Sequence, residues 1–317
     1  MEKLKLEIKV KDITTKEAFA KCIRLKKASN LSSETIKYYE DCFRYFSEFY
    51  PETSPCSGIT RDVYLQFVEY LQETRQAKTV TLNSYLRGVR AILYFFMEEN
   101  YMEQFKIKLL KMEKTIKETF TDEEVEKLLE KPDMKKSNFA QYRNWVMANY
   151  LFGTGNRIRT VLNVQIGHLD FGNNLIFMGK TKNGRQQLIP MSASLASVLK
   201  EYLCYRKGDE EDYLFCTLHG EQLTRNGVSS LMQKYHKDRG VTKTSLHMYR
   251  HTFARHWILN GGDIFRLQKI LGHSSLDMVR NYVEMFNEDL KKDFEVFNPL
   301  DNFTSCNKKG NVLTMKK

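Results

Sequence analysis

One short segment of the chain concentrates basic and titratable nitrogen: residues 247–257 read HMYRHTFARHW, in a chain with only seven histidines. His247 and Arg250 stand three residues apart, a spacing that puts two side chains on one face of a helix. Arginine presents a planar, permanently charged fork to phosphate oxygens, and histidine exchanges a proton near neutral pH. The pair therefore predicts a phosphate-binding site on a helix.

Two other interpretations of this segment remain open on its residues alone. His247 and His251 could form a zinc pair, but the glutamate of H-E-x-x-H is missing and no third ligand is obvious. A basic helix on the surface of a DNA-binding domain would show the same composition without catalysis. His251, Arg255 and His256 fit helix surface, phosphate contact or core packing, so we leave them out of the catalytic set.

Motifs on either side of the segment favour catalysis. Upstream lie GTGNRIRTV, which contains Arg157, and GKTKNGRQQLIP, which contains Lys182. Downstream, LGHSSLDMVRNY contains His273 and, nine residues later, Tyr282. Lys180 competes with Lys182 for the same role, and the spacing to the following proline favours Lys182.

At these residues the chain resembles the tyrosine recombinases, the phage integrase family that includes the Xer-type enzymes. The family pattern has an Arg after a T-G-x turn, a hairpin Lys eight residues before a Pro, H-x-x-R, L-G-H and a later Tyr, and the chain meets each part. The resemblance covers about residues 13–298. It implies a mainly α fold with a small antiparallel β-sheet (α+β), in which a helical core-binding (SAM-like) domain and a catalytic domain form a C-shaped clamp on DNA.

The chemistry of phosphodiester cleavage and the resemblance together suggest a role for each residue. Cleavage needs a nucleophile, groups that spread negative charge, and a proton for the departing oxygen. Tyr282 is expected to attack the phosphorus and form a 3′-phosphotyrosine ester, which conserves the bond energy, so that rejoining needs no ATP. Arg157 and Arg250 are expected to clamp the nonbridging oxygens in place of metal ions, so neither a metal nor another cofactor is expected.

Three further residues are expected to handle protons and the phosphate. His247 is the candidate to accept the tyrosine proton, Lys182 to protonate the leaving hydroxyl, and His273 to donate a hydrogen bond to the phosphate. One position departs from the family, which usually has an acidic residue three positions after the first arginine, where this chain has Thr160. A carboxylate at this position would be expected to support the active-site helices and not to contact the phosphate. The departure therefore concerns the packing around the site and not the proposed chemistry.

The sequence also predicts the elements that position these residues. Residues 13–104 read as four helices, the last with an apolar stripe at helical spacing formed by Leu82, Leu86, Val89, Leu93 and Phe96. Asn83, Arg87 and Arg90 fall at i, i+4 and i+7, so they are predicted to share a second face that contacts DNA, although a solvated face is equally compatible.

We divide the chain into an N-terminal extension (1–12), a helical domain (13–104), a lysine-rich linker over a charged surface (105–120), a catalytic domain (121–298) and a basic tail (299–317). A capping box, TDEE, marks a helix start at Thr121. Three short apolar segments around a KTKNG hairpin tip predict an antiparallel sheet. A helix at about 284–298, with an apolar stripe at Leu290, Phe294 and Phe297, is expected to dock in its own domain or on a neighbouring protomer.

Composition limits the function class. The 317 residues carry a formal net charge of +11, which indicates a polyanionic partner, either nucleic acid or an acidic membrane surface. No segment has the apolar length of a signal peptide or a membrane span, so a cytoplasmic protein is expected. The six cysteines form no C-x-x-C pair, which argues against a zinc site or a disulfide framework.

The sequence therefore predicts a site-specific DNA recombinase or integrase, Xer-like or from a mobile element, that acts on double-stranded DNA. The resemblance implies a homo-oligomer, a tetramer on two sites. Two alternatives remain: a type IB topoisomerase, which uses the same phosphotyrosine chemistry, and a sequence-specific DNA-binding factor without catalysis.

Overall fold

The computed structural model describes residues 13–112, 118–178 and 187–272. The chain divides into two compact units, Met1–Thr115 and Ile116–Lys317. Within the described ranges, no helix is long and apolar enough to cross a membrane.

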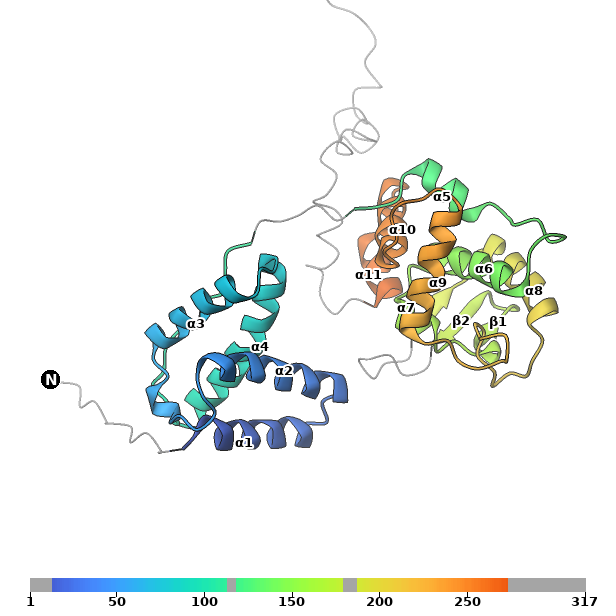
Figure 1. Ribbon diagram of the computed structural model, residues 1–317. Coiled ribbons are helices and arrows are strands. Elements are labelled where there is room, and N and C mark those ends of the chain that lie inside the picture. Colours follow the sequence, from blue (N-terminus) through green and yellow to red (C-terminus); the bar gives the residue numbers. More distant parts are fainter. Residues whose placement is uncertain (1–12, 113–117, 179–186, 273–317) are drawn as a thin grey trace, which may run out of the picture. The chain divides into compact units, whose positions relative to one another are not determined.

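The first unit is helical, as predicted (Figure 1). Threonine or serine caps begin three of its helices, because each hydroxyl accepts from a backbone N–H that has no partner inside the helix. Its helices are α1 (Thr15–Ala28), α2 (Ser33–Phe49), α3 (Arg61–Thr74) and α4 (Thr79–Glu98), with a short 3-10 turn at Cys56–Gly58.

Helix α4 supplies the centre of this unit's core. The apolar stripe predicted along it is buried at every position. The helix packs against α1, α2 and α3, which explains why a single stripe recurs over its full length.

The start of the expected linker belongs to this core. Ile107 is buried, and Phe105, Leu109 and Leu110 pack against the same cluster. The prediction that the linker runs over a charged surface is therefore wrong for residues 105–110, because its lysines alternate with apolar side chains that the unit buries.

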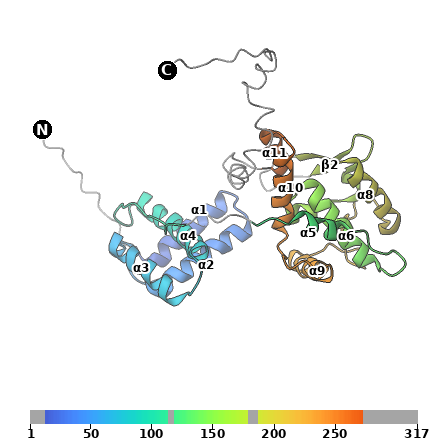
Figure 2. The same ribbon diagram turned by 90° about the horizontal axis from the view of Figure 1, so that it is seen from above.

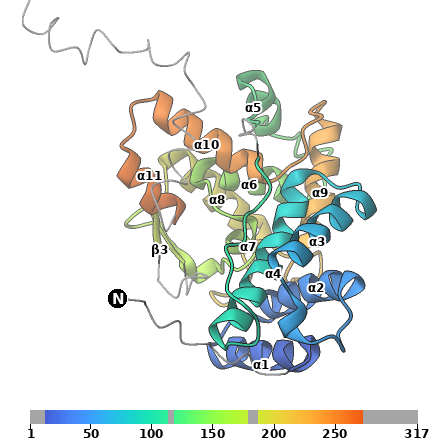
Figure 3. The same cartoon turned by 90° about the vertical axis from the view of Figure 1, so that its left-hand side faces the viewer.

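The second unit begins with the predicted capping box, in which Thr121 and Glu124 satisfy each other's backbone N–H groups. Helix α6 is buried on nearly all sides, in contact with α5, α8, α9 and α10 (Figure 3). The helices of this unit are α5 (Asp122–Leu129), α6 (Phe139–Thr154), α7 (Ile158–Val161), α8 (Ala193–Arg206), α9 (Arg225–Asp238), α10 (His247–Leu259) and α11 (Ile264–Leu271).

The predicted three-stranded antiparallel sheet is confirmed. Its strands β1 (Leu169–Asp170), β2 (Leu175–Met178) and β3 (Gln187–Pro190) lie in the order β1-β2-β3. Ile176 pairs with Ile189, and both side chains are fully buried. One face of the sheet therefore closes the core, as the alternation of a half-buried strand requires.

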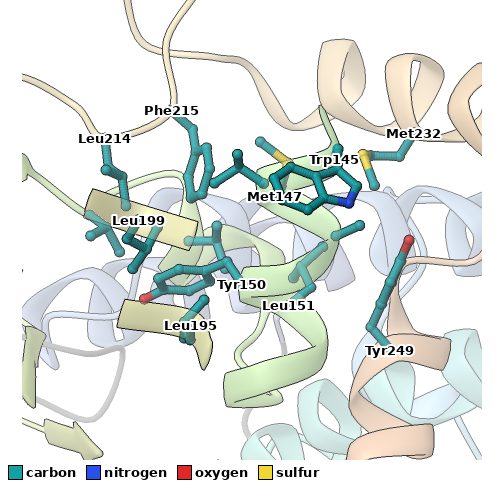
Figure 4. Packing of buried hydrophobic residues seen from close by; sticks show 14 of the residues in the cluster. Trp145, Met147, Tyr150, Leu151, Leu195, Leu199, Leu214, Phe215, Met232 and Tyr249 are labelled. Carbon is teal, nitrogen blue, oxygen red and sulfur yellow. The ribbon is translucent and has the colours of Figure 1, made fainter. Parts of the chain in front are cut away.

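The core of the second unit lies around α6 (Figure 4). Tyr150 of α6 lies beside Leu195 of α8, while Leu151 of α6 lies on the side of Tyr249, which projects into the same core from α10. Figures 1 and 2 both show α11 next to α10. The helix that carries the HMYRHTFARHW segment is thus packed between α6 and α11.

Candidate active site

Arg250 lies at the centre of the candidate site. It is only 4% exposed, and its guanidinium is held by two backbone carbonyls. Nη1 donates to the Gly155 carbonyl at 3.0 Å, and Nη2 donates to the Leu271 carbonyl at 2.8 Å. Gly155 is the C-cap of α6, and Leu271 is the last residue of α11. Two helix C-termini, each with carbonyls that lack helical partners and a partial negative charge, therefore fix this cation.

Arg157 reaches the same carbonyl from a different element. Its Nη1 donates to the Leu271 carbonyl at 3.4 Å, and the residue itself is exposed. Because both arginines bond to one oxygen, their guanidinium groups must lie close together. This convergence of two forks suits an anion with several oxygens, such as a phosphodiester.

The turn that presents Arg157 is built from buried polar groups. The Thr154 hydroxyl donates to the Tyr150 carbonyl at 2.7 Å and accepts from the backbone N–H of Asn156 at 3.3 Å. The Asn156 side chain also donates to the Tyr150 hydroxyl at 3.4 Å. Burial raises the pKa of Tyr150, so its hydroxyl keeps its proton. These bonds fix the start of α7, where Arg157 is the N-cap.

Gly155 is required at this turn. Its φ of 62° lies in the left-handed region, which side chains rarely adopt. A Cβ there would lie 2.6 Å from Phe253 and 2.8 Å from Leu271. Any larger residue would therefore push against α10, which carries Arg250, and against the end of α11, whose carbonyl accepts from it.

His247 is the first residue of α10 and is exposed, one turn before Arg250. The prediction that both residues lie on one helix is confirmed. Thr160, at the position that is usually acidic, is half-buried within α7, where its backbone N–H closes the turn on the Arg157 carbonyl at 2.8 Å.

Lys182, His273 and Tyr282 lie outside the described residues, as do Leu290, Phe294 and Phe297. His273 nevertheless follows the C-cap of α11 directly, since Gly272 occupies that position in the left-handed conformation. The carbonyl that both arginines contact therefore belongs to Leu271, the first residue of the L-G-H motif.

The sequence analysis did not identify the backbone carbonyls that hold the two arginines. The carbonyls of Gly155 and Leu271 have no residue type that a pattern could detect; the only signal is the pair of glycines at the ends of α6 and α11. Within the described part of the chain, no group of three or more His, Cys, Asp or Glu residues could hold a metal ion.

The predicted DNA-contact face of α4 is wrong at Asn83, which is only 1% exposed. Its amide donates to the Leu110 carbonyl and accepts from the Leu110 N–H, both at 2.9 Å. Asn83 therefore links α4 to the backbone of Leu110, and its side chain is too buried to contact DNA. Arg87 is exposed and Arg90 is half-buried, so contact of these two residues with DNA stays a prediction.

Comparisons with known proteins identify the family and structures of similar fold. Residues 118–288 match the model of the phage integrase family. Tyrosine recombinase XerA of Pyrococcus furiosus is 30% identical over 275 residues, which cover 86% of this chain and 90% of the relative. Tyrosine recombinase XerD of Staphylococcus epidermidis is 26% identical over 298 residues, 89% of this chain and 98% of the relative.

Two solved structures share the fold. The Tn1549 transposon integrase, in complex with circular intermediate DNA, superposes with a TM-score of 0.70 at 21% identity and covers 88% of this chain and 100% of that one. The XerH site-specific recombinase, in a post-cleavage complex with a palindromic difH substrate, gives 0.67 at 22% identity, with 89% and 84% covered. Since the family match spans more than half of the sequence and a relative at 30% identity covers most of it, the chain belongs to the phage integrase family.

Proposed function

We propose that this protein is a site-specific DNA recombinase that breaks and rejoins DNA strands through a tyrosine intermediate. The observation that carries the proposal is the convergence of Arg157 and Arg250 on the carbonyl of Leu271, the first residue of the L-G-H motif. Relatives named tyrosine recombinases and neighbours solved on DNA support it. A topoisomerase or a non-catalytic DNA-binding factor is not favoured.

In this mechanism the two arginines bind the scissile phosphate and neutralise the charge that grows as the phosphorus gains a fifth oxygen. Arg250 is held in place before DNA arrives, so it reorganises little at the moment of reaction. Tyr282 attacks the phosphorus, the 3′-phosphotyrosine bond forms and the bond to the 5′ oxygen breaks. His247 accepts the tyrosine proton, Lys182 gives a proton to the 5′ oxygen, and His273 donates a hydrogen bond to the phosphate.

The direct test is covalent capture. The full chain is incubated with a nicked suicide duplex, whose short leaving strand diffuses away and prevents rejoining, and then run on a denaturing gel. We expect a protein band shifted by the mass of the attached strand. Absence of any covalent species on cognate DNA would contradict the proposed function.

Lys182 is expected to act on the leaving group. We predict that Lys182→Ala slows cleavage of an ordinary phosphodiester by about 10²–10⁴, the usual contribution of general acid catalysis. A substrate with sulfur in place of the 5′ bridging oxygen should restore the rate, because a thiolate leaves without a proton. The rate with each substrate is measured under single-turnover conditions.

Lys180→Ala serves as the matched control in the same hairpin and should cleave both substrates at the wild-type rate. If sulfur rescues Lys180→Ala and not Lys182→Ala, the assignment of the hairpin lysine is shifted by two residues.

We propose further that the first unit contributes DNA contacts through Arg87 and Arg90, and that both units bind one duplex. The net charge of +11 supports a polyanionic partner. We also propose that the reaction takes place in the cytoplasm, with a chromosome or a mobile element as the target.

We also propose a homo-oligomer, a tetramer on two DNA sites, held together in part by residues 284–298. Truncation after about residue 286 is predicted to leave half-site binding within a factor of about two and to abolish cooperative filling of a full site. An isolated segment of this length gains its helical stability mainly from what it packs against. Gel-shift titration on half and full sites measures both quantities.

Unchanged cooperativity in the truncated chain would mean that residues 284–298 pack on their own domain. Loss of half-site binding as well would mean that the segment supports the fold of the second unit rather than assembly.

A further inference from the structure

Helix α10 has two opposite faces, and only one of them belongs to the candidate active site. His247, Arg250 and His251 fall at i, i+3 and i+4, so they share one face of the helix. Tyr249, Thr252 and His256 fall at i, i+3 and i+7 on the opposite face, which we call the back face. The back face contains none of the six proposed catalytic residues, yet it is closely packed with polar contacts.

Those contacts come from the point at which the chain enters the second unit. Phe120 is fully buried, and its backbone N–H donates to the Thr252 hydroxyl at 3.0 Å. Its ring lies 5.1 Å from that of Tyr249, edge to face. Two residues later, Asp122 Oδ1 lies 3.4 Å from His256 Nε2. Residues 119–122, which we call the strap, therefore contact α10 at each of its three back-face positions.

Lys243 holds the strap in place and, through His236, also contacts Tyr249 of the back face. Lys243 Nζ donates to the Thr119 carbonyl at 3.0 Å and to Glu124 Oε2 at 2.8 Å. The Lys243 carbonyl lies 2.8 Å from His236 Nδ1 and can only accept, so the proton of the ring is on Nδ1. His236 Nε2 then accepts from the Tyr249 hydroxyl at 2.9 Å. Burial lowers the pKa of His236 and raises that of Tyr249, which favours the neutral forms this arrangement needs.

We propose that the strap fixes the rotation of α10 about its axis and its position along that axis, and that Thr252 is a positioning residue for His247 and Arg250. The inference rests on the proposed function, since it concerns the placing of groups for the same reaction. Thr252 lies two residues after Arg250 and is fully buried, so a shift of its hydroxyl moves the backbone that carries the arginine. A displacement of about 1 Å in a reacting group can cost about 10² in rate.

The test is single-turnover cleavage of a nicked suicide duplex by the full chain at saturating protein. Thr252→Val keeps the shape of the side chain and removes the acceptor for the Phe120 N–H. We expect cleavage at least about tenfold slower with half-site affinity within about twofold, because the helix shifts while the DNA-contacting surface remains. Thr252→Ser, which keeps the hydroxyl, should restore most of the rate.

The matched control is Tyr202→Phe, which removes another buried hydrogen bond of the same unit, from the Tyr202 hydroxyl to the Leu214 carbonyl at 3.1 Å. Thermal unfolding is recorded for every variant. Thr252→Val and Tyr202→Phe should lose similar stability, and only Thr252→Val should lose cleavage. Equal cleavage rates for the two variants would overturn the inference.

A second variant covers the case in which Thr252→Val does not fold. Lys243→Met loosens the strap at Thr119 from a half-buried position and keeps the apolar stem of the side chain. We expect it to cleave about threefold or more slowly with unchanged affinity; a wild-type rate would contradict the strap. If the wild-type chain itself forms no covalent complex, the proposed function fails, whereas the inference fails only when wild type cleaves and the variants match it.

Discussion

Replacing Tyr282 by Phe is expected to abolish the covalent protein–DNA complex while specific DNA binding persists. The substitution removes one oxygen, and that oxygen is the atom that would bond to phosphorus. Loss of the nucleophile in an enzyme that relies on covalent catalysis costs on the order of 10⁶ in rate, so no band should be detected within hours. The contacts of Arg157 and Arg250 to the phosphate do not depend on the phenolic oxygen, and half-site affinity should stay within about twofold.

The measurement is denaturing electrophoresis after incubation with the nicked suicide duplex, beside a gel shift on the intact duplex. Tyr205→Phe is the matched control, because it removes the same oxygen from an exposed tyrosine of α8 in the same unit. It should form the covalent complex at the wild-type rate. A persistent covalent band in Tyr282→Phe would assign the nucleophile to another residue.

Local rules predicted much of the fold. The stripe along α4 and the capping box at Thr121 depend on residues within one or two helical turns of each other, and both are present as predicted. The strands β1 to β3 were predicted from short apolar segments with turn residues between them, and their order follows from hairpin connections. Such signals are readable because the interacting residues are close in sequence.

The errors and omissions have a common physical origin in contacts between distant residues. Asn83 was assigned to an exposed face because spacing on α4 cannot show that the chain returns 27 residues later and pairs its backbone with that amide. The anchors of Arg250 lie 95 and 21 residues away and are carbonyl groups, which every residue has. Sequence predicted which side chains could do the chemistry, whereas the backbone that holds them emerged only from the folded chain.

Because Arg250 and Arg157 are held differently, we expect their substitutions to have similar effects on cleavage but different effects on stability. Arg157→Ala and Arg250→Ala should each slow cleavage by about 10²–10³, the usual cost of one lost donor to charge that develops in the transition state. Their effects on stability should differ. Arg250 is buried and its charged side chain makes two hydrogen bonds, each contributing about 1.5–3 kcal/mol to the free energy of unfolding. Arg157 is exposed, and its bond to Leu271 is long at 3.4 Å.

Single-turnover cleavage and thermal unfolding of the same preparations measure the two effects separately. Arg250→Ala removes the donor to the Gly155 carbonyl and the shorter of the two bonds to the Leu271 carbonyl, so it should lower the midpoint of unfolding by several degrees. Arg157→Ala should hardly change it. Arg250→Lys sharpens the comparison, because one ammonium keeps the charge but cannot span both carbonyls as a planar fork does. It should recover part of the stability and little of the cleavage. Two results would contradict this assignment: cleavage by Arg157→Ala at the wild-type rate, or a loss of stability in Arg157→Ala as large as in Arg250→Ala. In either case the shared contact with the Leu271 carbonyl would be a packing contact and would not identify a phosphate-binding site.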